Sequence, residues 1–203
     1  MSSPDAFPLT YTRRWRDALE LAERAHRGQR RKSGDKPYIV HPFVVSQILA
    51  TAGADDDLVI AGYLHDVAED TDVNLVEIED KFGLRVRRLV EGVTKVEIVE
   101  GRRLSSAEKL QLTEERMESA HSDVVALKAA DLIANMTDLV IDQQDHGYGH
   151  WEQMFKPGKL EHYSRLAEII IARLDREQVY PRLSSTLSAR LEQFRALLER
   201  WER

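Results

Sequence analysis

Hydrophobic residues recur at intervals of three and four along most of this chain, which is the spacing that gathers them on one face of an α-helix. In the first such stretch, residues 11–27, Trp15, Ala18 and Ala22 share a face, and Gly28 then favours the end of the helix. Because no segment alternates convincingly between apolar and polar residues, we expect an all-α fold, a single compact helical bundle. The same spacing predicts further helices over residues 42–52, 58–64, 75–82, 84–93, 105–120, 123–141, 160–174 and 183–201.

Polar residues mark where some of these helices begin. The run Asp55–Asp57 offers a cap and favourable charge at a helix start, and Ser105 with Glu108 has the spacing of a capping box. We predict a loop or a short extended piece over residues 95–104 and a loop over residues 145–158.

The composition is that of a globular protein. Of 203 residues, 42% are hydrophobic and 32% are charged, which is enough apolar material for a core. A formal net charge of −6 argues against general binding to nucleic acid, and the absence of cysteine excludes disulfides and thiolate chemistry. No apolar run approaches the length of a membrane-spanning helix, and the N-terminus lacks a signal-peptide pattern, so we expect a cytoplasmic protein with no membrane partner.

Four polar residues follow the most hydrophobic of the predicted helices, residues 58–64. They are His65, Asp66, Glu69 and Asp70, and burying such groups costs free energy unless they bind something. If the helix runs on to Asp70, His65 and Glu69 share one face, and Asp66 and Asp70 share the next. The pattern predicts a metal held by His65 and Asp66, with the carboxylates of Glu69 and Asp70 just beyond it; the alternative is a solvated helix end.

Two further candidates for this site lie elsewhere in the chain. His41 stands at the start of the predicted helix 42–52, and Asp131 lies in an apolar run where an unpaired carboxylate would be costly. With His65 and Asp66 they would form a mixed nitrogen and oxygen site of a kind that suits Mn²⁺, Fe²⁺ or Zn²⁺. Alternatively, His41 hydrogen-bonds the backbone near a helix N-terminus.

Other polar residues have simpler explanations as well. Asp131 would also be satisfied by a buried ion pair with Lys128 or Arg173. The basic residues 30–32 would supply positive charge for phosphates, or they form a solvated charge run. His26, at the inner edge of the first helix, is best explained as a hydrogen-bonded histidine of the core.

Taken together, these residues resemble a known family, the HD superfamily of metal-dependent phosphohydrolases. More narrowly, they resemble the hydrolase domain of RelA/SpoT-type alarmone enzymes. Any one matching segment alone would be weak, but together and in this order they are highly specific. The segments lie between about residues 18 and 140 and are Gln29–Gly34, Pro37–Pro42, Leu64–Thr71, Phe82–Gly83, Glu91–Lys95 and Lys128–Met136.

The resemblance implies an HD-domain helical bundle over residues 1–203, with C-terminal helices 160–203 packed on the part that carries the motifs. It implies a metal, typically Mn²⁺ although another divalent ion would suit the same ligands. The family removes the 3′-pyrophosphate from ppGpp or pppGpp and so gives GDP or GTP. No synthetase or regulatory domain fits in this length, so the chain resembles a free-standing small alarmone hydrolase. The implied metal ligands are His41, His65, Asp66 and Asp131.

The resemblance also assigns roles to other residues. Glu69 and Asp70 match the catalytic acid/base pair, and the segment Thr94–Lys95 is expected to be structural or only indirectly helpful. The residues that match positions holding the guanosine nucleotide are Arg31, Lys32, Ser33 and Asn135.

The sequence departs from the family pattern in two places. The usual Arg-Thr-Leu is replaced by Thr137–Leu139, which removes one positive charge and adds the negative charge of Asp138. A pyrophosphate would bind less well beside that carboxylate, other things equal. Residues 145–159 match no family motif and are a candidate lid or substrate selector.

Two other functions therefore stay open. The first is hydrolysis of another nucleotide at the same site. The second is binding of a nucleotide without catalysis, and the intact acid/base pair argues against it. The sequence also does not decide whether the apolar stripe in residues 183–198 packs internally or on a second copy in a homo-oligomer.

Overall fold

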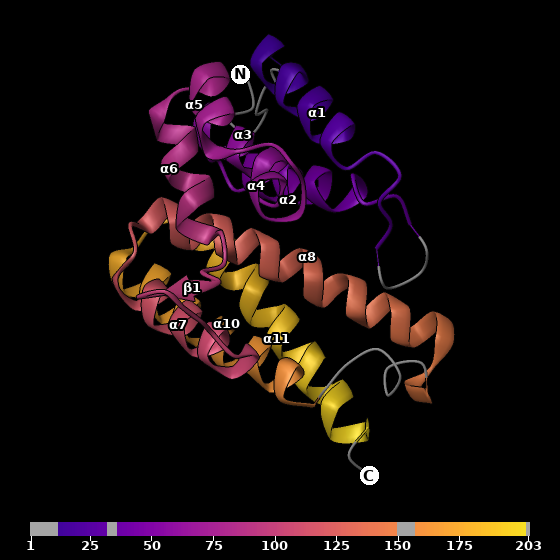
Figure 1. Ribbon diagram of the computed structural model, residues 1–203. Helices are drawn as coiled ribbons and strands as arrows, with labels where there is room; N and C mark the ends of the chain where they lie inside the picture. Colours follow the sequence, from indigo (N-terminus) through magenta and orange to yellow (C-terminus); the bar gives the residue numbers. More distant parts are fainter. Residues whose placement is uncertain (1–11, 32–35, 150–156, 202–203) are drawn as a thin grey trace, which may run out of the picture.

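The computed structural model describes residues 12–31, 36–149 and 157–201, and it is helical almost throughout (Figure 1). The helices form two groups, one from each half of the chain. They meet along the long helix α8, Ser122–His146, which runs through the middle of the molecule. The predicted all-α fold is confirmed.

Helix α3 lies at the centre of the N-terminal group. Every residue from Leu58 to Leu64 is buried, and the helix packs on α1, α2, α6 and α8. The side chain of Asp55 caps it by accepting a hydrogen bond from the backbone N–H of Leu58 at 3.0 Å, as the sequence predicted. The helices of this group are α1 (Arg13–Ala25), α2 (Val40–Thr51), α3 (Asp56–Leu64), α4 (Val67–Asp70), α5 (Leu75–Phe82) and α6 (Leu84–Val93).

Helices α2 and α3 approach each other closely at Gly62. A Cβ atom there would lie 2.8 Å from Ser46 Oγ and 2.9 Å from Leu49 Cδ1, both on α2. The hydroxyl of Ser46 donates a hydrogen bond to the carbonyl oxygen of Val59 on α3 at 3.0 Å. Glycine at position 62 therefore sets the spacing between α2 and α3. Helix α2 carries His41 and α3 directly precedes His65, the two histidines of the candidate metal site.

The C-terminal group consists of α7 (Ser106–Ser119), α10 (Pro157–Glu177) and α11 (Pro181–Trp201). Helix α10 packs against α7, α8 and α11, and α11 also packs on α8. The predicted capping box at the start of α7 is present. On α11 the apolar stripe from Leu183 to Phe194 is buried in the hydrophobic core, so it packs within the chain.

The helix predicted to run through to Asp70 is broken at the His–Asp pair. Helix α3 ends just before His65, and His65 and Asp66 form a turn before α4 begins. The carbonyl oxygen of Asp66 accepts hydrogen bonds from the backbone N–H groups of Glu69 at 3.2 Å and Asp70 at 2.9 Å. The condition for the shared faces, a helix that continues to Asp70, is therefore not met, and a turn and a short helix present these residues instead.

A short hairpin occupies part of the segment predicted as a loop or short extended piece. Strand β1, Ile98–Val99, pairs antiparallel with β2, Arg102–Arg103. The two residues between them, Glu100 and Gly101, have φ values of 50° and 78°, which is the backbone sign of a type I′ turn. With two residues in each strand, the hairpin is too short for an alternating pattern to be visible.

At its C-terminal end α8 is longer than the predicted helix 123–141, because it continues to His146. Half of the predicted loop 145–158, residues 150–156, lies outside the described residues, so its expected role as a lid stays a prediction. No helix in the described part of the chain is long and apolar enough to cross a membrane.

Candidate metal centre

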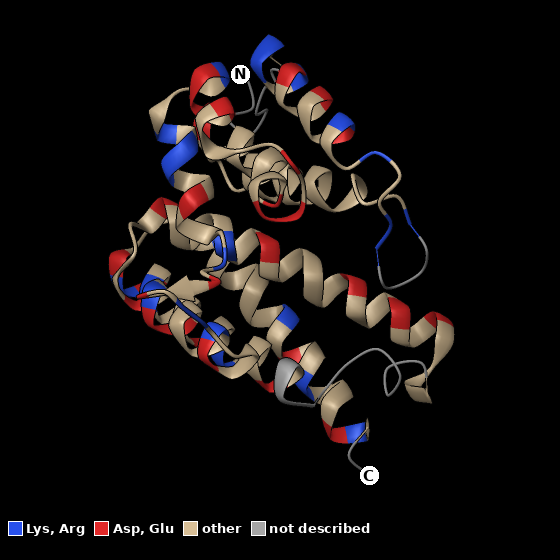
Figure 2. Ribbon diagram, in the orientation of Figure 1, with Lys and Arg blue, Asp and Glu red and all other residues tan. Residues whose placement is uncertain are grey.

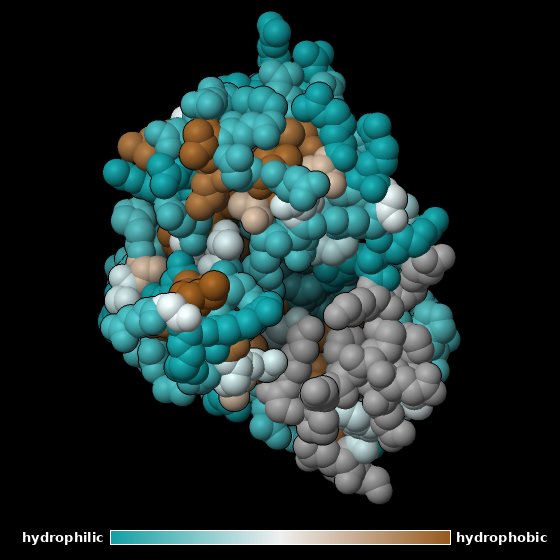
Figure 3. Space-filling model, in the orientation of Figure 1, coloured by the Kyte–Doolittle hydropathy of each residue, from teal (hydrophilic) through white to brown (hydrophobic). Residues whose placement is uncertain are grey.

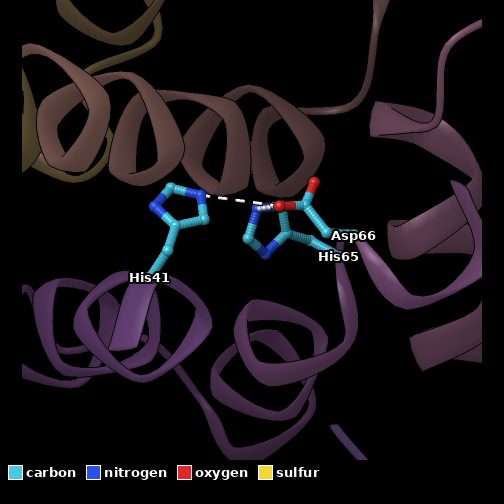
Figure 4. A group of neighbouring side chains, drawn as sticks. All are labelled: His41, His65 and Asp66. Atoms are coloured by element: carbon cyan, nitrogen blue, oxygen red, sulfur yellow. Dashed lines mark ion pairs between the residues drawn. The ribbon is translucent and has the colours of Figure 1, made fainter. Parts of the chain in front are cut away.

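Two buried histidines from neighbouring elements point toward each other close to α8 (Figure 4). His41 stands in the first turn of α2 and His65 directly follows α3, and each is 3% exposed. Their ring centroids lie 5.1 Å apart. Nδ1 of His65 lies 2.9 Å from the carbonyl oxygen of Gly62, so a proton on Nδ1 is donated to that carbonyl and Nε2 is left to bind a metal.

Two carboxylates complete the cluster. Oδ2 of Asp66 lies 3.2 Å from His65 Nε2 and 3.6 Å from His41 Nε2. Oδ1 of Asp131, from α8, lies 3.1 Å from His41 Nε2 and 3.7 Å from His65 Nε2. One ligand atom from each of His41, His65 and Asp66 lies within 4.8 Å of the other two. The fold thus brings together the four side chains predicted as metal ligands, and we call them the metal cluster.

The donor set of the metal cluster fits a divalent cation. Two imidazole nitrogens and two carboxylate oxygens converge from α2, the α3–α4 turn and α8. Within residues 12–31, 36–149 and 157–201, the buried Nε2 of His65 has no hydrogen-bond partner of normal geometry. Mixed nitrogen and oxygen ligands of this kind suit Mn²⁺, Fe²⁺ or Zn²⁺.

The electrostatics of the cluster also favour a cation. Burial alone would raise the pKa of Asp66, but His65 and His41 outweigh burial and hold that pKa well below its usual range. Burial alone would lower the pKa of His65, yet Asp66 and Asp131 raise it to about 10. A histidine that takes up a proton between two carboxylates marks a place where positive charge is stabilised, and a divalent ion supplies such charge.

Asp131 makes further contacts beside the metal cluster. Lys128 Nζ lies 2.7 Å from Oδ2, and the amide of Asn135 donates a hydrogen bond to Oδ1 at 2.5 Å. The ion pair that was the alternative explanation for Asp131 is therefore present, but it uses Oδ2 whereas Oδ1 lies next to the histidines. The other alternative partner, Arg173, is paired with Glu177.

The two further carboxylates, Glu69 and Asp70, have different partners. The hydroxyl of Tyr38 lies 2.8 Å from Asp66 Oδ2 and 2.9 Å from Asp70 Oδ2, and its single proton is donated to one of them at a time. The backbone N–H of Lys95 donates to Glu69 Oε2 at 3.1 Å, and the Lys95 ammonium contacts Oε1 of the same carboxylate. Glu69 is thus held at both oxygens by one residue.

Lys95 is a site residue that the sequence analysis missed. Burial alone would lower its pKa, but contact with Glu69 raises it, so the side chain stays charged. The available signal was its place at the end of the Glu91–Lys95 motif, which was interpreted as structural. The contact becomes visible only when the segment after α6 is seen beside α4.

Arg31 reaches from the segment after α1 to α8. Its Nη2 donates hydrogen bonds to Asn135 Oδ1 at 2.8 Å and Asp138 Oδ2 at 3.1 Å, and its guanidinium carbon lies 5.6 Å from the ring centroid of Tyr38. Only 16% of the Arg31 side chain is exposed, so it is not part of a solvated charge run. Asp138 is therefore an ion-pair partner of Arg31, which the sequence did not reveal.

Two predicted nucleotide-binding residues, Lys32 and Ser33, lie outside the described residues. His26 is a buried histidine whose Nδ1 lies 2.8 Å from Gln29 Oε1 and whose ring stacks on Tyr38 with centroids 4.5 Å apart. The prediction that it is a hydrogen-bonded core histidine is confirmed.

The metal cluster, Glu69, Asp70, Lys95 and Arg31 line one cleft of about 610 Å³. It lies between the two helix groups, where the space-filling view is hollowed and mostly hydrophilic (Figure 3). Acidic positions gather on α4 at one side of the cleft, and basic positions occur on α7 at the other (Figure 2). The α7 and α10 side also contributes polar residues that the sequence analysis did not single out: Lys109, Thr113, His162 and Tyr163.

Comparison with known proteins gives matches to both sequence and structure. The sequence model of the HD domain family matches residues 18–153. A GTP pyrophosphokinase of Streptomyces coelicolor is 44% identical over 119 residues, which are 59% of this chain and 14% of that protein. A guanosine-3′,5′-bis(diphosphate) 3′-pyrophosphohydrolase of Borreliella burgdorferi is 41% identical over 123 residues, 60% of this chain and 18% of that protein. The chain thus spans less than a fifth of the length of these curated relatives.

A solved structure, described as a metazoan ortholog of SpoT that hydrolyzes ppGpp, matches with a TM-score of 0.73 and 25% sequence identity. The match covers 93% of this chain and 97% of that one, so the similarity includes the C-terminal helices beyond residue 153. The metal cluster and the pair Glu69 and Asp70 all lie inside the part that the HD domain model matches.

Proposed function

The chain belongs to the HD-domain family, and on that basis we propose that it is a metal-dependent hydrolase that removes the 3′-pyrophosphate from ppGpp or pppGpp. The observation that carries the proposal is the convergence of four candidate metal ligands and two further carboxylates in one cleft. The names of the Borreliella relative and of the metazoan structure support a guanosine nucleotide as the substrate.

In this proposal the metal cluster holds Mn²⁺. When bound, the ion supplies Lewis-acid activation of the attacking water and neutralises charge on the phosphate. The chain's own contribution is to fix the ligands: the Gly62 carbonyl orients His65, and the amide of Asn135 holds Asp131.

Glu69 and Asp70 divide the acid/base work. Water attacks the phosphorus of the 3′-pyrophosphate, the bond to the ribose 3′-oxygen breaks, and that oxygen needs a proton to leave. Glu69, held at both oxygens by Lys95, orients the attacking water and takes up its proton as the new bond to phosphorus forms. Asp70, beside the hydroxyl of Tyr38, delivers the proton to the 3′-oxygen.

Arg31 and Asn135 hold the nucleoside, together with Lys32 and Ser33 of the segment after Arg31. The guanidinium of Arg31 is planar and suits stacking on a base, and its contacts with Asn135 and Asp138 fix its orientation. A second candidate function is hydrolysis of another phosphorylated nucleotide, and Asp138 favours it. This carboxylate lies beside Arg31 at one end of the cleft, where it departs from the usual family pattern.

The test is a nucleotide screen with the purified protein loaded with Mn²⁺. We expect it to release pyrophosphate and GDP from ppGpp, measured by anion-exchange chromatography of the products. Turnover of other phosphorylated nucleotides without turnover of ppGpp would support the second candidate. Tight nucleotide binding with no turnover of any nucleotide would contradict both.

A further inference from the structure

His162 is a buried histidine of the cleft that the proposed reaction does not use. It comes from α10, lines the cleft, and has a side chain only 5% exposed. Its Nδ1 lies 2.7 Å from Oε1 of Glu114, a residue of α7. Among the residues that the structure describes, its Nε2 has no hydrogen-bond partner. The imidazole is therefore anchored to a carboxylate at Nδ1, and no described residue competes with a ligand at Nε2.

The charged groups that face His162 come from three helices. Besides Glu114, α7 contributes Lys109 to the same side of the cleft, and α8 contributes Lys128. On α10 itself, Arg165 Nε donates a hydrogen bond to Glu114 Oε1 at 3.3 Å. Over the described ranges, His162 has no hydrogen bond or ion pair with a residue of α11. Three cations thus lie around Glu114 on this side, and each of them also pairs with another carboxylate: Lys109 with Glu97, Lys128 with Asp131 and Arg165 with Glu161.

Four other cations of the cleft are already paired with carboxylates. A phosphate would have to compete with a carboxylate for each of these cations. His162, in contrast, gains a positive charge by taking up a proton and keeps Glu114 as its partner. The pairs are Arg31 with Asp138, Lys95 with Glu69, Lys109 with Glu97, and Lys128 with Asp131.

We propose that His162, held by Glu114, binds a phosphate oxygen of the nucleotide on the α7 and α10 side of the cleft and takes up a proton when it does so. The metal cluster engages the 3′-pyrophosphate in the proposed reaction, so the group at His162 is the nucleotide's 5′-diphosphate. The proposal rests on the proposed function for the identity of this ligand.

The direction of the pH effect follows from the surroundings of His162. Burial lowers its pKa, nearby Lys128 and Arg165 lower it further, and Glu114 raises it only in part, so the free protein holds a neutral imidazole at pH 7. A phosphate placed at Nε2 adds negative charge and raises this pKa. The contribution of His162 to phosphate binding therefore increases as the pH falls.

The experiment compares binding of GDP and of guanosine to the full chain loaded with Mn²⁺, in the wild type and in His162→Gln, at pH 6 and pH 8. We expect the variant to bind GDP roughly tenfold more weakly than the wild type at pH 6, as for loss of one charge-assisted hydrogen bond, and the deficit to shrink at pH 8. Guanosine, which lacks phosphates, should bind both proteins equally at both pH values.

Two further variants sharpen this comparison. His121→Gln makes the same change at a histidine whose side chain is 75% exposed, outside the cleft, and should leave both affinities unchanged. Glu114→Gln keeps an acceptor for Nδ1 but removes the charge that supports a protonated ring, so it should weaken GDP binding mainly at pH 6. Thermal unfolding of each variant shows that the fold is retained.

Three results would overturn the proposal: equal losses for GDP and guanosine, a GDP deficit independent of pH, or no binding of GDP by the wild type. Failure of the proposed function is a separate result. Absence of ppGpp hydrolysis would leave the comparison of GDP with guanosine intact, because that comparison requires no turnover.

Discussion

Single side chains make the two proposed catalytic carboxylates unequal. Lys95 holds both oxygens of Glu69, whereas Asp70 competes with Asp66 for the one proton of the Tyr38 hydroxyl. The position of the Glu69 carboxylate is therefore fixed by a cation, whereas Asp70 has only a shared hydroxyl as its neighbour. The division of labour between neighbouring residues is therefore set by what each one touches.

Removing the proton carrier tests this assignment. Asp70→Asn should lower kcat for ppGpp by about 10²- to 10⁴-fold, because the 3′-oxygen then leaves without a proton. Metal content, measured by atomic emission on the purified protein, should be unchanged, since Asp70 is not a ligand. A variant that keeps wild-type turnover would show that Asp70 has no such role.

Lys95 offers a second test at the same scale. Lys95→Gln should lower kcat roughly ten- to a hundredfold, as for loss of a hydrogen bond between charged groups, with a smaller change in KM. The control is Lys81→Gln, which removes an exposed lysine paired with Glu77 on α5, away from the cleft, and should change neither constant. Identical kinetics for both variants would place Lys95 outside the reaction.

The sequence predicted the metal cluster but not its neighbours, and the reason is physical. His41, His65, Asp66 and Asp131 are costly in apolar surroundings, and that cost is readable in the sequence. Lys95 and His162 lie among ordinary polar residues, so their contacts depend on how distant helices pack, which a local pattern does not contain.

At the scale of elements, the crossing of α2 and α3 positions the two histidines. The crossing is close because Gly62 has no side chain, and the Gly62 carbonyl also orients His65. Most helix limits were predicted to within a few residues from apolar spacing and caps, as for α5, α6 and α7. The break in the helix at His65 was not predicted. Both residues of the turn, His65 and Asp66, keep nearly helical backbone angles, and no glycine or proline marks the turn in the sequence.

Substitution at the crossing should therefore affect both stability and the metal. Gly62→Ala adds a methyl group within 2.9 Å of α2 atoms, which should lower the free energy of unfolding by about 1 to 3 kcal/mol and weaken Mn²⁺ binding. Urea unfolding and metal titration measure the two effects. The control is Gly149→Ala, at an exposed glycine where an added Cβ meets nothing within 4 Å. Equal stability of both variants would mean that the crossing has room to adjust.

For the whole molecule, the metal cluster gathers side chains from parts that are distant in sequence. Its ligands come from α2, the turn after α3, and α8, so an ion held by all of them joins the N-terminal helices to the helix on which the C-terminal group packs. The cleft exists only because the two helix groups meet there. The sequence motifs end near residue 140, so they could not predict which residues of α7 and α10 line the other side of the cleft.

Metal binding should accordingly stabilise the entire fold. With Mn²⁺ at about 100 times its dissociation constant, the free energy of unfolding should rise by about 2.7 kcal/mol, and Tm should rise with it. His65→Ala should abolish this shift and remove bound metal. A shift of the same size in the variant would remove His65 from the ligand set.

Helix α8 presents Lys128, Asp131, Asn135 and Asp138 at intervals of three and four, so they lie along one face of a straight element. Asp131 and Asp138 are separated by about 10 Å along the helix axis. One end of this span adjoins the histidines and the other end holds Arg31. A nucleotide that engages both ends in the proposed reaction must therefore span about this distance, and a shorter molecule would reach only one of them.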